Sequence, residues 1–326
     1  MSSIWGATRN ISGLDVKGLT PIPGFRPTAA EVGVYKEGSG VYNTGKTIER
    51  SGGMSEPRVL TIQDISCVGR CSMAVALPVL AACGVEACPL PTAVLSTHTG
   101  GFGMPHIADL TAHMLPMAEH WGRAGLAFDV LFCGYLGSRE QMTLVEQIFD
   151  IAAAPGCVKI IDPAMADHGK LYSGFDPEFV AEMKRFCARA DWFLPNITEA
   201  CLLTGTEFRT DYDKCYIDAL MEKLYGLGCR HILLTGVSFE PESIGVMADS
   251  EYISHRRLSG SCHGTGDLFA AVFAGALARG KSGGTAARLA AEFTLSCMEY
   301  TFSRCEVPYG IAFEPVLGEL IRKIGE

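Results

Sequence analysis

Residues 261–280 read SCHGTGDLFAAVFAGALARG, and this stretch decides the fold. Two glycines flank Thr265, a single carboxylate follows at Asp267, and apolar residues from Leu268 to Ala276 continue at helical spacing. The pattern predicts a glycine loop that opens a helix. The first turn of a helix carries unpaired N–H groups and partial positive charge, so it attracts anions, and glycine lets the backbone approach them closely. Asp267 is unexpected there, because a carboxylate would repel the anion.

The composition is typical of a globular protein with a large core. Of the 326 residues, 48% are hydrophobic and 19% are charged. No apolar run reaches the roughly 18 residues that span a bilayer, and the N-terminus lacks the apolar region of a signal peptide. The net charge of −9 argues against non-specific nucleic-acid binding. We therefore expect a cytoplasmic protein with neither nucleic-acid nor membrane partners.

Cysteine is frequent, but its spacing indicates no metal or disulfide framework. The chain has 13 cysteines and no C-x-x-C pair. We expect reduced thiols that act as small core residues. The reactivity of Cys67, Cys71 and Cys262 stays open.

The first 53 residues differ from the rest. They hold ten glycines and few aliphatic residues, and Met54 opens a stretch that is typical of a natural start. We expect either a flexible N-terminal extension or a mis-assigned start over residues 1–53, followed by a single domain over 54–326.

From Arg58 onward, short apolar runs alternate with longer segments of helical period. The expected strands are Val59–Ile62, Val130–Cys133, Val158–Ile161, Trp192–Leu194 and His231–Thr235, with a hairpin at Ile244–Met247 and Tyr252–His255. The expected helices cover about 71–83, 105–120, 139–153, 177–189, 212–227, 265–279 and 284–302. Such alternation predicts an α/β fold whose parallel sheet is covered on both faces and binds ligands beyond the carboxyl ends of its strands.

Polar residues gather in the segments that we interpret as turns. These segments are residues 63–70, 91–101, 134–138, 162–167 and 195–199. Each alone is typical of an ordinary turn, and Asn196 with Glu199 could merely cap a helix. Their joint occurrence favours a ligand site.

Together these motifs resemble the ribokinase-like superfamily and, within it, the pyridoxal/pyridoxamine kinases of vitamin B6 salvage. The resemblance runs from about Arg58 to Arg304 and is carried by LTIQ (60–63), STHTG (96–100), GYLGS (134–138), DPAMAD (162–167), PNITE (195–199) and GTGD (264–267). It implies a three-layer α/β/α sandwich with a mostly parallel central sheet, no separate lid domain, and a homodimer. Residues 54–326 would be the kinase domain.

The resemblance also accounts for Asp267. In this family the GTGD aspartate is the catalytic base, so Asp267 would take the proton of the substrate hydroxymethyl group as it attacks the γ-phosphorus of ATP. Backbone around Gly264, Thr265 and Gly266 would hold the transferred phosphoryl group, while metal charge offsets the carboxylate. A helix N-cap is the alternative role for Asp267.

The other site residues follow from the same resemblance. The residues expected to contact ATP are Asp162, Asn196, Glu199, Thr235, Gly264 and Gly266. Mg²⁺ would be held by Asp162, Asp167 and Glu199, partly through water. The B6 ring would lie near Asp64, Cys71, Thr99 and Tyr135. A requirement for a monovalent cation such as K⁺ stays open.

One departure from the family concerns Asp64, where the best-known pyridoxal kinases have a serine that meets the pyridine nitrogen. A carboxylate there favours a protonated ring nitrogen or a nearby cationic amine. We therefore hypothesise a preference for pyridoxamine or a related aminopyrimidine.

Several alternatives stay open. A hydroxymethylpyrimidine (phosphate) kinase of thiamin synthesis shares the fold and reaction, but commonly carries cysteine in place of Asp267. A sugar kinase would need an early β-lid, and a dehydrogenase would need G-x-G-x-x-G after the first strand. A non-catalytic B6 carrier would have no need of a general base. His98 and His263 fall in the expected site, where we interpret them as hydrogen-bonded loop residues.

Overall fold

The computed structural model describes residues 56–304 and 309–325. The predicted extension over residues 1–53 and the predicted start at Met54 lie outside this part of the chain.

Within the described residues, nine strands form one sheet in the order β11-β10-β9-β8-β5-β4-β1-β2-β3. The six inner strands run parallel, whereas β3 pairs antiparallel with β2, and β10 pairs antiparallel with both β9 and β11. The strands are β1 (Arg58–Ser66), β2 (Glu86–Leu95), β3 (Ile107–Asp109), β4 (Phe128–Cys133), β5 (Ala153–Ile161), β8 (Trp192–Phe193), β9 (His231–Val237), β10 (Ser243–Ala248) and β11 (Glu251–Arg256). A separate two-stranded hairpin joins β6 (Ala166–Asp167) to β7 (Lys170–Leu171).

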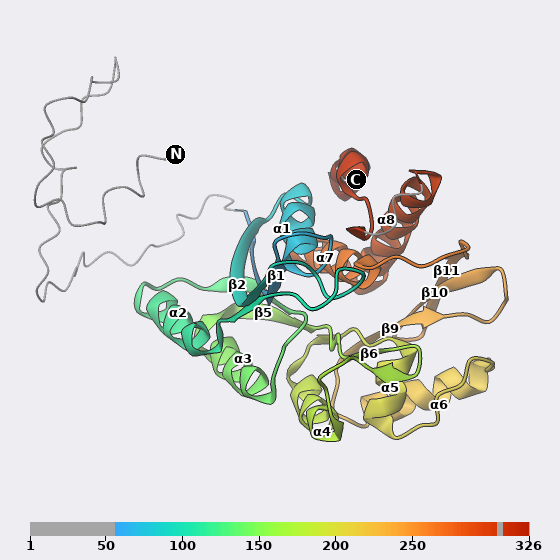
Figure 1. Ribbon diagram of the computed structural model, residues 1–326, viewed down its shortest axis with the longest axis horizontal. Helices are drawn as coiled ribbons and strands as arrows, with labels where there is room; N and C mark the ends of the chain where they lie inside the picture. The colour runs from blue at the N-terminus through green and yellow to red at the C-terminus, as the bar shows by residue number, and fades with distance from the viewer. Residues whose placement is uncertain (1–55, 305–308, 326) are drawn as a thin grey trace, which may run out of the picture. The chain divides into compact units, whose positions relative to one another are not determined.

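Helices cover both faces of the sheet, which confirms the three-layer prediction (Figure 1). One face carries α2 (Thr111–Arg123), α3 (Arg139–Ala152), α4 (Pro177–Phe186), α5 (Ile197–Thr204) and α6 (Lys214–Tyr225). The opposite face carries α1 (Met73–Ala82), α7 (Thr265–Ala278), α8 (Gly283–Arg304) and α9 (Leu317–Gly325). Short 3₁₀ turns lie at Cys187–Arg189 and Glu314–Val316.

Helix α7 is the central helix of its layer. Every residue from Leu268 to Ala276 is buried, because α1 and α8 pack against α7 and the sheet lies beneath it. A helix that is apolar on all sides is stable only when neighbours surround it, so its sequence already specifies an interior position. Among the described residues, no helix is both long and apolar enough to cross a membrane.

Strands β1, β2 and β5 differ most from the prediction, and β5 begins at Ala153 where the sequence predicted a start at Val158. Strand β1 continues to Ser66, so Asp64 stands on the strand and not in the turn after it. Strand β2 was not predicted, because Pro89 and Pro91 are typical of turns. Its prolines are tolerated near the edge of the sheet, where β3 pairs only with residues 93–95.

Two helices also differ. The expected helix at 105–120 begins only at Thr111, because residues 107–109 pair as β3. Residues 197–204 form α5, where the sequence predicted a turn. The alternative reading of Asn196 and Glu199 as helix-capping residues is confirmed by a complete capping box.

The cysteines behave as the composition predicts. All those in the described part of the chain are free, and many lie in the core, such as Cys133 and Cys297. Burial raises the pKa of the Cys71 thiol, and raises that of Cys262 to about 11. Both side chains are therefore thiols at neutral pH and weak nucleophiles.

The contact between α1 and α7 leads to a stability prediction. A β-carbon at Gly275 would lie 2.6 Å from Cys83 Sγ and 2.8 Å from its Cβ. Alanine normally stabilises a helix interior by about 0.5–1 kcal/mol relative to glycine, but overpacking costs about 1–3 kcal/mol. Gly275→Ala should therefore lower the free energy of unfolding in urea. Gly318→Ala on α9, where the nearest atom is 3.8 Å away, is the matched control and should not.

Candidate functional site

The first turn of α7 is fixed by a glycine that admits no side chain. Gly264 is the N-cap, with φ of 82°, and its carbonyl accepts the first helical hydrogen bond from Leu268 at 2.9 Å. A β-carbon on Gly264 would lie 2.0 Å from the carbonyl oxygen of Arg70. Any other residue would push the helix away from the β1–α1 loop, so the sequence motif and this contact depend on each other.

The space in front of this turn is open. Apart from its chain neighbours and the backbone of its own helix, no atom lies within 4 Å of the position that a β-carbon on Gly266 would take, and Gly266 is exposed. The first turn of this 14-residue helix therefore borders a region that an anion can enter.

Asp267 stands in this first turn but does not cap it, because Gly264 holds the N-cap position. The Asp267 carboxylate instead accepts a hydrogen bond from the backbone N–H of Ser72. Burial raises the pKa of Asp267 to about 6, and the charge of Asp64 adds to the rise. The N-cap alternative is thus wrong for this residue, which remains free to exchange a proton near neutral pH.

Asp64 is a buried carboxylate near the end of β1, only 4% exposed. Burial raises its pKa, while hydrogen bonds from the side chains of Ser72 and Ser66 lower it. The Ser66 hydroxyl donates to Asp64 Oδ2 at 3.4 Å. The charge of Asp64 also acts on Asp267, so the two carboxylates are near neighbours in the fold.

Cys71 and Tyr135 border the same carboxylates. Burial raises the pKa of Cys71, and the charges of Asp267 and Asp64 raise it further. Burial likewise raises the pKa of the Tyr135 phenol, with a further contribution from Asp64. The Tyr135 ring meets that of Phe175 at 5.7 Å between centroids. The structure therefore brings Asp64, Cys71 and Tyr135 together beside Asp267.

The Thr99 loop lies beside the start of α7. Gly100 packs against the His263 ring, since a β-carbon there would be 2.6 Å from Nε2. Thr99 itself is exposed. His98 is buried, accepts a hydrogen bond from the Gly100 N–H at 3.1 Å and fills the space beneath Gly69. These contacts agree with the interpretation of His98 as a hydrogen-bonded loop residue.

Glu199 ties α5 to the turn after β5. Its Oε1 accepts the N–H groups of Met165 and Ala166 at 2.8 and 3.3 Å, and Oε2 accepts the Asn196 N–H at 2.9 Å. Burial raises the pKa of Glu199 to about 7 against these hydrogen bonds. The Asn196 side chain donates in turn to the carbonyl of Ala166 at 2.8 Å.

Asp162 lies within reach of two other carboxylates, Glu199 at the α5 cap and Asp267 in the first turn of α7. Burial raises its pKa, and the charges of Glu199 and then Asp267 add to the rise. Tyr172 is near the same set, because the charges of Glu199, Asp162 and Asp267 all act on its phenol, whose pKa burial raises. Asp162 therefore connects the α7 turn to the capping box of α5.

The carboxylates predicted to bind Mg²⁺ would supply only part of the ligands of such an ion. The described residues hold no group of three His, Cys, Asp or Glu side chains placed to bind a metal alone. Asp167 is exposed and accepts the His168 N–H at 2.7 Å, while Glu199 is engaged by backbone. Mg²⁺ retains waters and phosphate oxygens in many sites, so the half-buried carboxylate of Asp162 fits such an ion.

Thr235 lies on β9 next to the α5 cap. Its N–H donates to the Pro195 carbonyl at 2.9 Å, and Thr235 pairs with Asn196 in an isolated bridge. The predicted ATP contacts Asn196 and Thr235 are thus adjacent.

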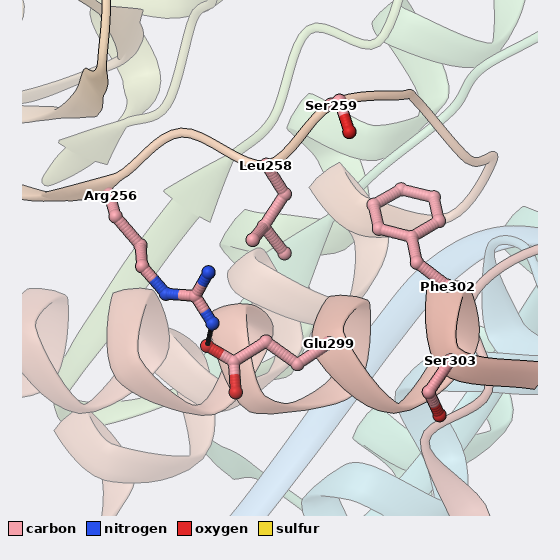
Figure 2. Close-up of a pocket in the computed structure, with 6 residues that line it drawn as sticks. All are labelled: Arg256, Leu258, Ser259, Glu299, Phe302 and Ser303. Atoms are coloured by element: carbon pink, nitrogen blue, oxygen red, sulfur yellow. Dashed lines mark hydrogen bonds and ion pairs between the residues drawn. The ribbon is translucent and has the colours of Figure 1, made fainter.

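A shallow hollow of about 270 Å³ lies between the segment after β11 and the end of α8 (Figure 2). Leu258, Ser259 and Phe302 line it, and an ion pair of 2.7 Å joins Arg256 to Glu299 across it. Ser259 precedes Gly264 by five residues on the segment that leads into α7. Sequence reasoning missed this hollow because its residues form no motif.

Sequence reasoning also missed Ser72 and Tyr172. Ser72 acts on Asp64 and Asp267, and Tyr172 responds to the charges of Glu199 and Asp162, but neither residue carries a spacing signal. The position of Ser72 directly after Cys71, a predicted ring contact, was the one available hint.

Comparison with known proteins identifies the family and the fold. The model of the phosphomethylpyrimidine kinase family matches residues 75–310. The pyridoxine/pyridoxal/pyridoxamine kinase of Bordetella avium is 29% identical over 248 residues, which cover 69% of this chain and 78% of that protein.

Solved structures show the same fold. The pyridoxal kinase from Lactobacillus plantarum has a TM-score of 0.76 and 33% identity, covering 82% of this chain and 98% of its own. The Leishmania donovani pyridoxal kinase in complex with ADP and pyridoxamine has a TM-score of 0.70 at 20% identity, covering 81% and 96%. The chain therefore belongs to the phosphomethylpyrimidine kinase family and has the ribokinase-like fold of the pyridoxal kinases, as its motifs predict.

Proposed function

We propose that this protein transfers the γ-phosphoryl group of ATP to the 5′-hydroxymethyl group of pyridoxal, pyridoxine or pyridoxamine. The observation that carries the proposal is Asp267, a carboxylate with a pKa of about 6 that stands beside the open first turn of α7. The similarity to the Lactobacillus plantarum pyridoxal kinase supports the substrate class.

In the proposed reaction, the substrate hydroxyl oxygen forms a bond to the γ-phosphorus as the bond from that phosphorus to the bridging oxygen of ADP breaks. Asp267 accepts the hydroxyl proton. The backbone at Gly264, Thr265 and Gly266 stabilises the charge on the phosphoryl oxygens, and ADP leaves.

The carboxylates at the other side of the site would serve the nucleotide. Asp162 would hold Mg²⁺, with Asp167 and Glu199 acting through water. When bound, Mg²⁺ neutralises charge on the ATP phosphates. Glu199 and Asn196 also keep the turn of residues 162–166 in place through their hydrogen bonds. The requirement for a monovalent cation such as K⁺ stays open.

The proposed B6 pocket is bordered by Asp64, Cys71, Thr99 and Tyr135. Tyr135 offers a ring face beside Phe175, and Asp64 offers a buried charge that would pair with a protonated ring nitrogen or the amine of pyridoxamine. Exposed Thr99 is free to bond the ring hydroxyl.

The base of ATP would lie in the hollow beside Phe302. Leu258 and Ser259, which line that hollow, stand on the segment that leads into α7. The nucleotide would run from the hollow toward the phosphoryl site at Gly266. Phe302 supplies an aromatic surface for stacking, and Thr235 would contact the nucleotide from β9.

Two other functions would use the same fold. The matched family model is named for phosphomethylpyrimidine kinase, so hydroxymethylpyrimidine or its phosphate is the alternative acceptor. A non-catalytic B6 carrier is less well supported, because it would not need an acidic group with a raised pKa beside a phosphoryl site.

We also propose a homodimer in the cytoplasm. Met104 and Ile107 are 93% and 50% exposed beside the edge strand β3, and apolar side chains of this kind favour contact with a second subunit. The cytoplasmic location rests on the sequence.

The proposed general base, Asp267, leads to a kinetic prediction. Asp267→Asn should lower kcat by about 10² or more, because asparagine cannot accept the proton. For the wild type, kcat/KM should rise with pH through about 6 and then level off, since the base acts when deprotonated. Coupled ADP-release assays with Mg²⁺ and each of the three B6 vitamers and hydroxymethylpyrimidine measure both.

Turnover of the pyrimidine alone would favour the thiamin alternative. Tight binding of a vitamer without turnover would favour the carrier.

The carboxylate of Asp64 predicts vitamer preference. Asp64→Ser should reduce the ratio of kcat/KM for pyridoxamine to that for pyridoxal by about tenfold, equivalent to about 1.4 kcal/mol, because the cationic amine loses its partner. The kinetics of both vitamers with wild type and variant test this. An equal or better wild-type kcat/KM for pyridoxal that the substitution leaves unchanged would remove the idea.

The hollow predicts an effect on the nucleotide alone. Phe302→Ala should raise KM for ATP about tenfold, consistent with a lost ring contact, and leave KM for the vitamer unchanged. Steady-state kinetics with each substrate varied in turn measure this. An equal increase in KM for ATP and in KM for the vitamer would contradict a separate site for the adenine base.

A further inference from the structure

Ser72 occupies a backbone conformation that serine rarely adopts. It precedes α1 as the N-cap, with φ of 49° and ψ of −130°, yet its side chain makes no capping hydrogen bond. Such values cost about 1–3 kcal/mol for a residue with a β-carbon and persist only where surrounding structure enforces them. The residue is buried at 7% exposure, so the strain lies inside the fold.

The surroundings fix Ser72 on two sides. It pairs with Ile65 at the end of β1 in an isolated antiparallel bridge, and its carbonyl accepts the N–H groups of Val75 and Ala76 at 3.0 Å each. The preceding residues are held as well, because the Arg70 N–H donates to the Tyr309 carbonyl at 2.9 Å.

In this conformation, one residue contacts both carboxylates of the proposed site. The Ser72 side chain acts on Asp64 and its backbone N–H acts on Asp267, and each lowers the pKa of that carboxylate as a hydrogen-bond donor does. The bridge to Ile65 holds Ser72 beside the end of β1, next to the position of Asp64. A capping serine with ordinary extended backbone would direct its hydroxyl to its own helix.

We propose that Ser72 is a positioning residue that orients the substrate-recognition carboxylate Asp64 and the proposed base Asp267 together. The proposal rests on the function proposed above. It assigns separate tasks to the hydroxyl and the backbone N–H of Ser72. The hydroxyl fixes Asp64 for vitamer binding, and the N–H fixes Asp267 for proton transfer. The strained backbone is retained because it makes both contacts available from one residue.

Two substitutions separate the task of the Ser72 hydroxyl from the effect of the backbone strain. Ser72→Ala removes the hydroxyl and keeps both the strain and the N–H. Ser72→Gly removes the hydroxyl but also relieves the strain, because glycine adopts positive φ freely. A residue that only supported the fold would give variants whose kinetics follow their stability.

We expect KM for pyridoxamine to rise about five- to tenfold in both variants, with kcat within about threefold of wild type and KM for ATP unchanged. Ser72→Gly should melt a few degrees above Ser72→Ala. The glycine variant would thus combine higher stability with weaker vitamer binding. An unchanged KM for pyridoxamine in both variants would overturn the proposal.

A second readout needs no activity, so it separates this inference from the proposed function. Carbon-13 NMR titration of aspartate carboxyl groups in the protein without substrate should show a higher pKa for Asp64 in Ser72→Ala than in wild type, because the carboxylate loses a donor. The titratable groups that respond to Asp64 are Tyr135, Cys71 and Asp267, and all remain in the variant. The hydroxyl of Ser66, the other side-chain donor to Asp64, also remains.

If the wild type phosphorylates no vitamer, the proposed function fails, and this titration alone decides the role of Ser72. An Asp64 titration that is identical in the two proteins would overturn it.

Discussion

The close approach of Gly264 to the Arg70 carbonyl is the constraint on which the site depends. It presses the start of α7 onto the β1–α1 loop and so brings Asp267 under the N–H of Ser72. The buried apolar residues of α7 then hold the helix in the centre of its layer. Backbone contact, more than side-chain attraction, therefore sets the distance between the phosphoryl site and the carboxylates.

That arrangement concentrates negative charge where water is scarce. Asp64, Asp162, Glu199 and Asp267 all have raised pKa values, because burial opposes ionisation. For Asp162, Glu199 and Asp267, the charge of a neighbouring carboxylate adds to the rise. In a kinase, a metal cation and a positively charged vitamer would relieve part of this electrostatic cost on binding. The strain at Ser72 adds to the free energy that the apo fold carries at its site.

Much of this could be predicted from the sequence. The periodicity located most inner strands and helices, and the motifs at their ends named residues that the fold places near one another, such as Asp64, Tyr135 and Asp267. The prolines of β2 hid that strand, because edge position and not local propensity makes them tolerable. Ser72 and the hollow at Phe302 could not be predicted, since each depends on contacts between segments far apart in the chain.

The prolines of β2 have a consequence for how copies of the chain can meet. The Glu86 N–H donates inward to the Pro57 carbonyl, so alternation along the strand directs the nitrogens of Pro89 and Pro91 outward. Those positions present no N–H donor to a strand from another molecule, which protects this margin from templating amyloid-like stacking. Two subunits that associate along this part of β2 would have to pack through their side chains, because the two sheets could not join there by regular backbone hydrogen bonds.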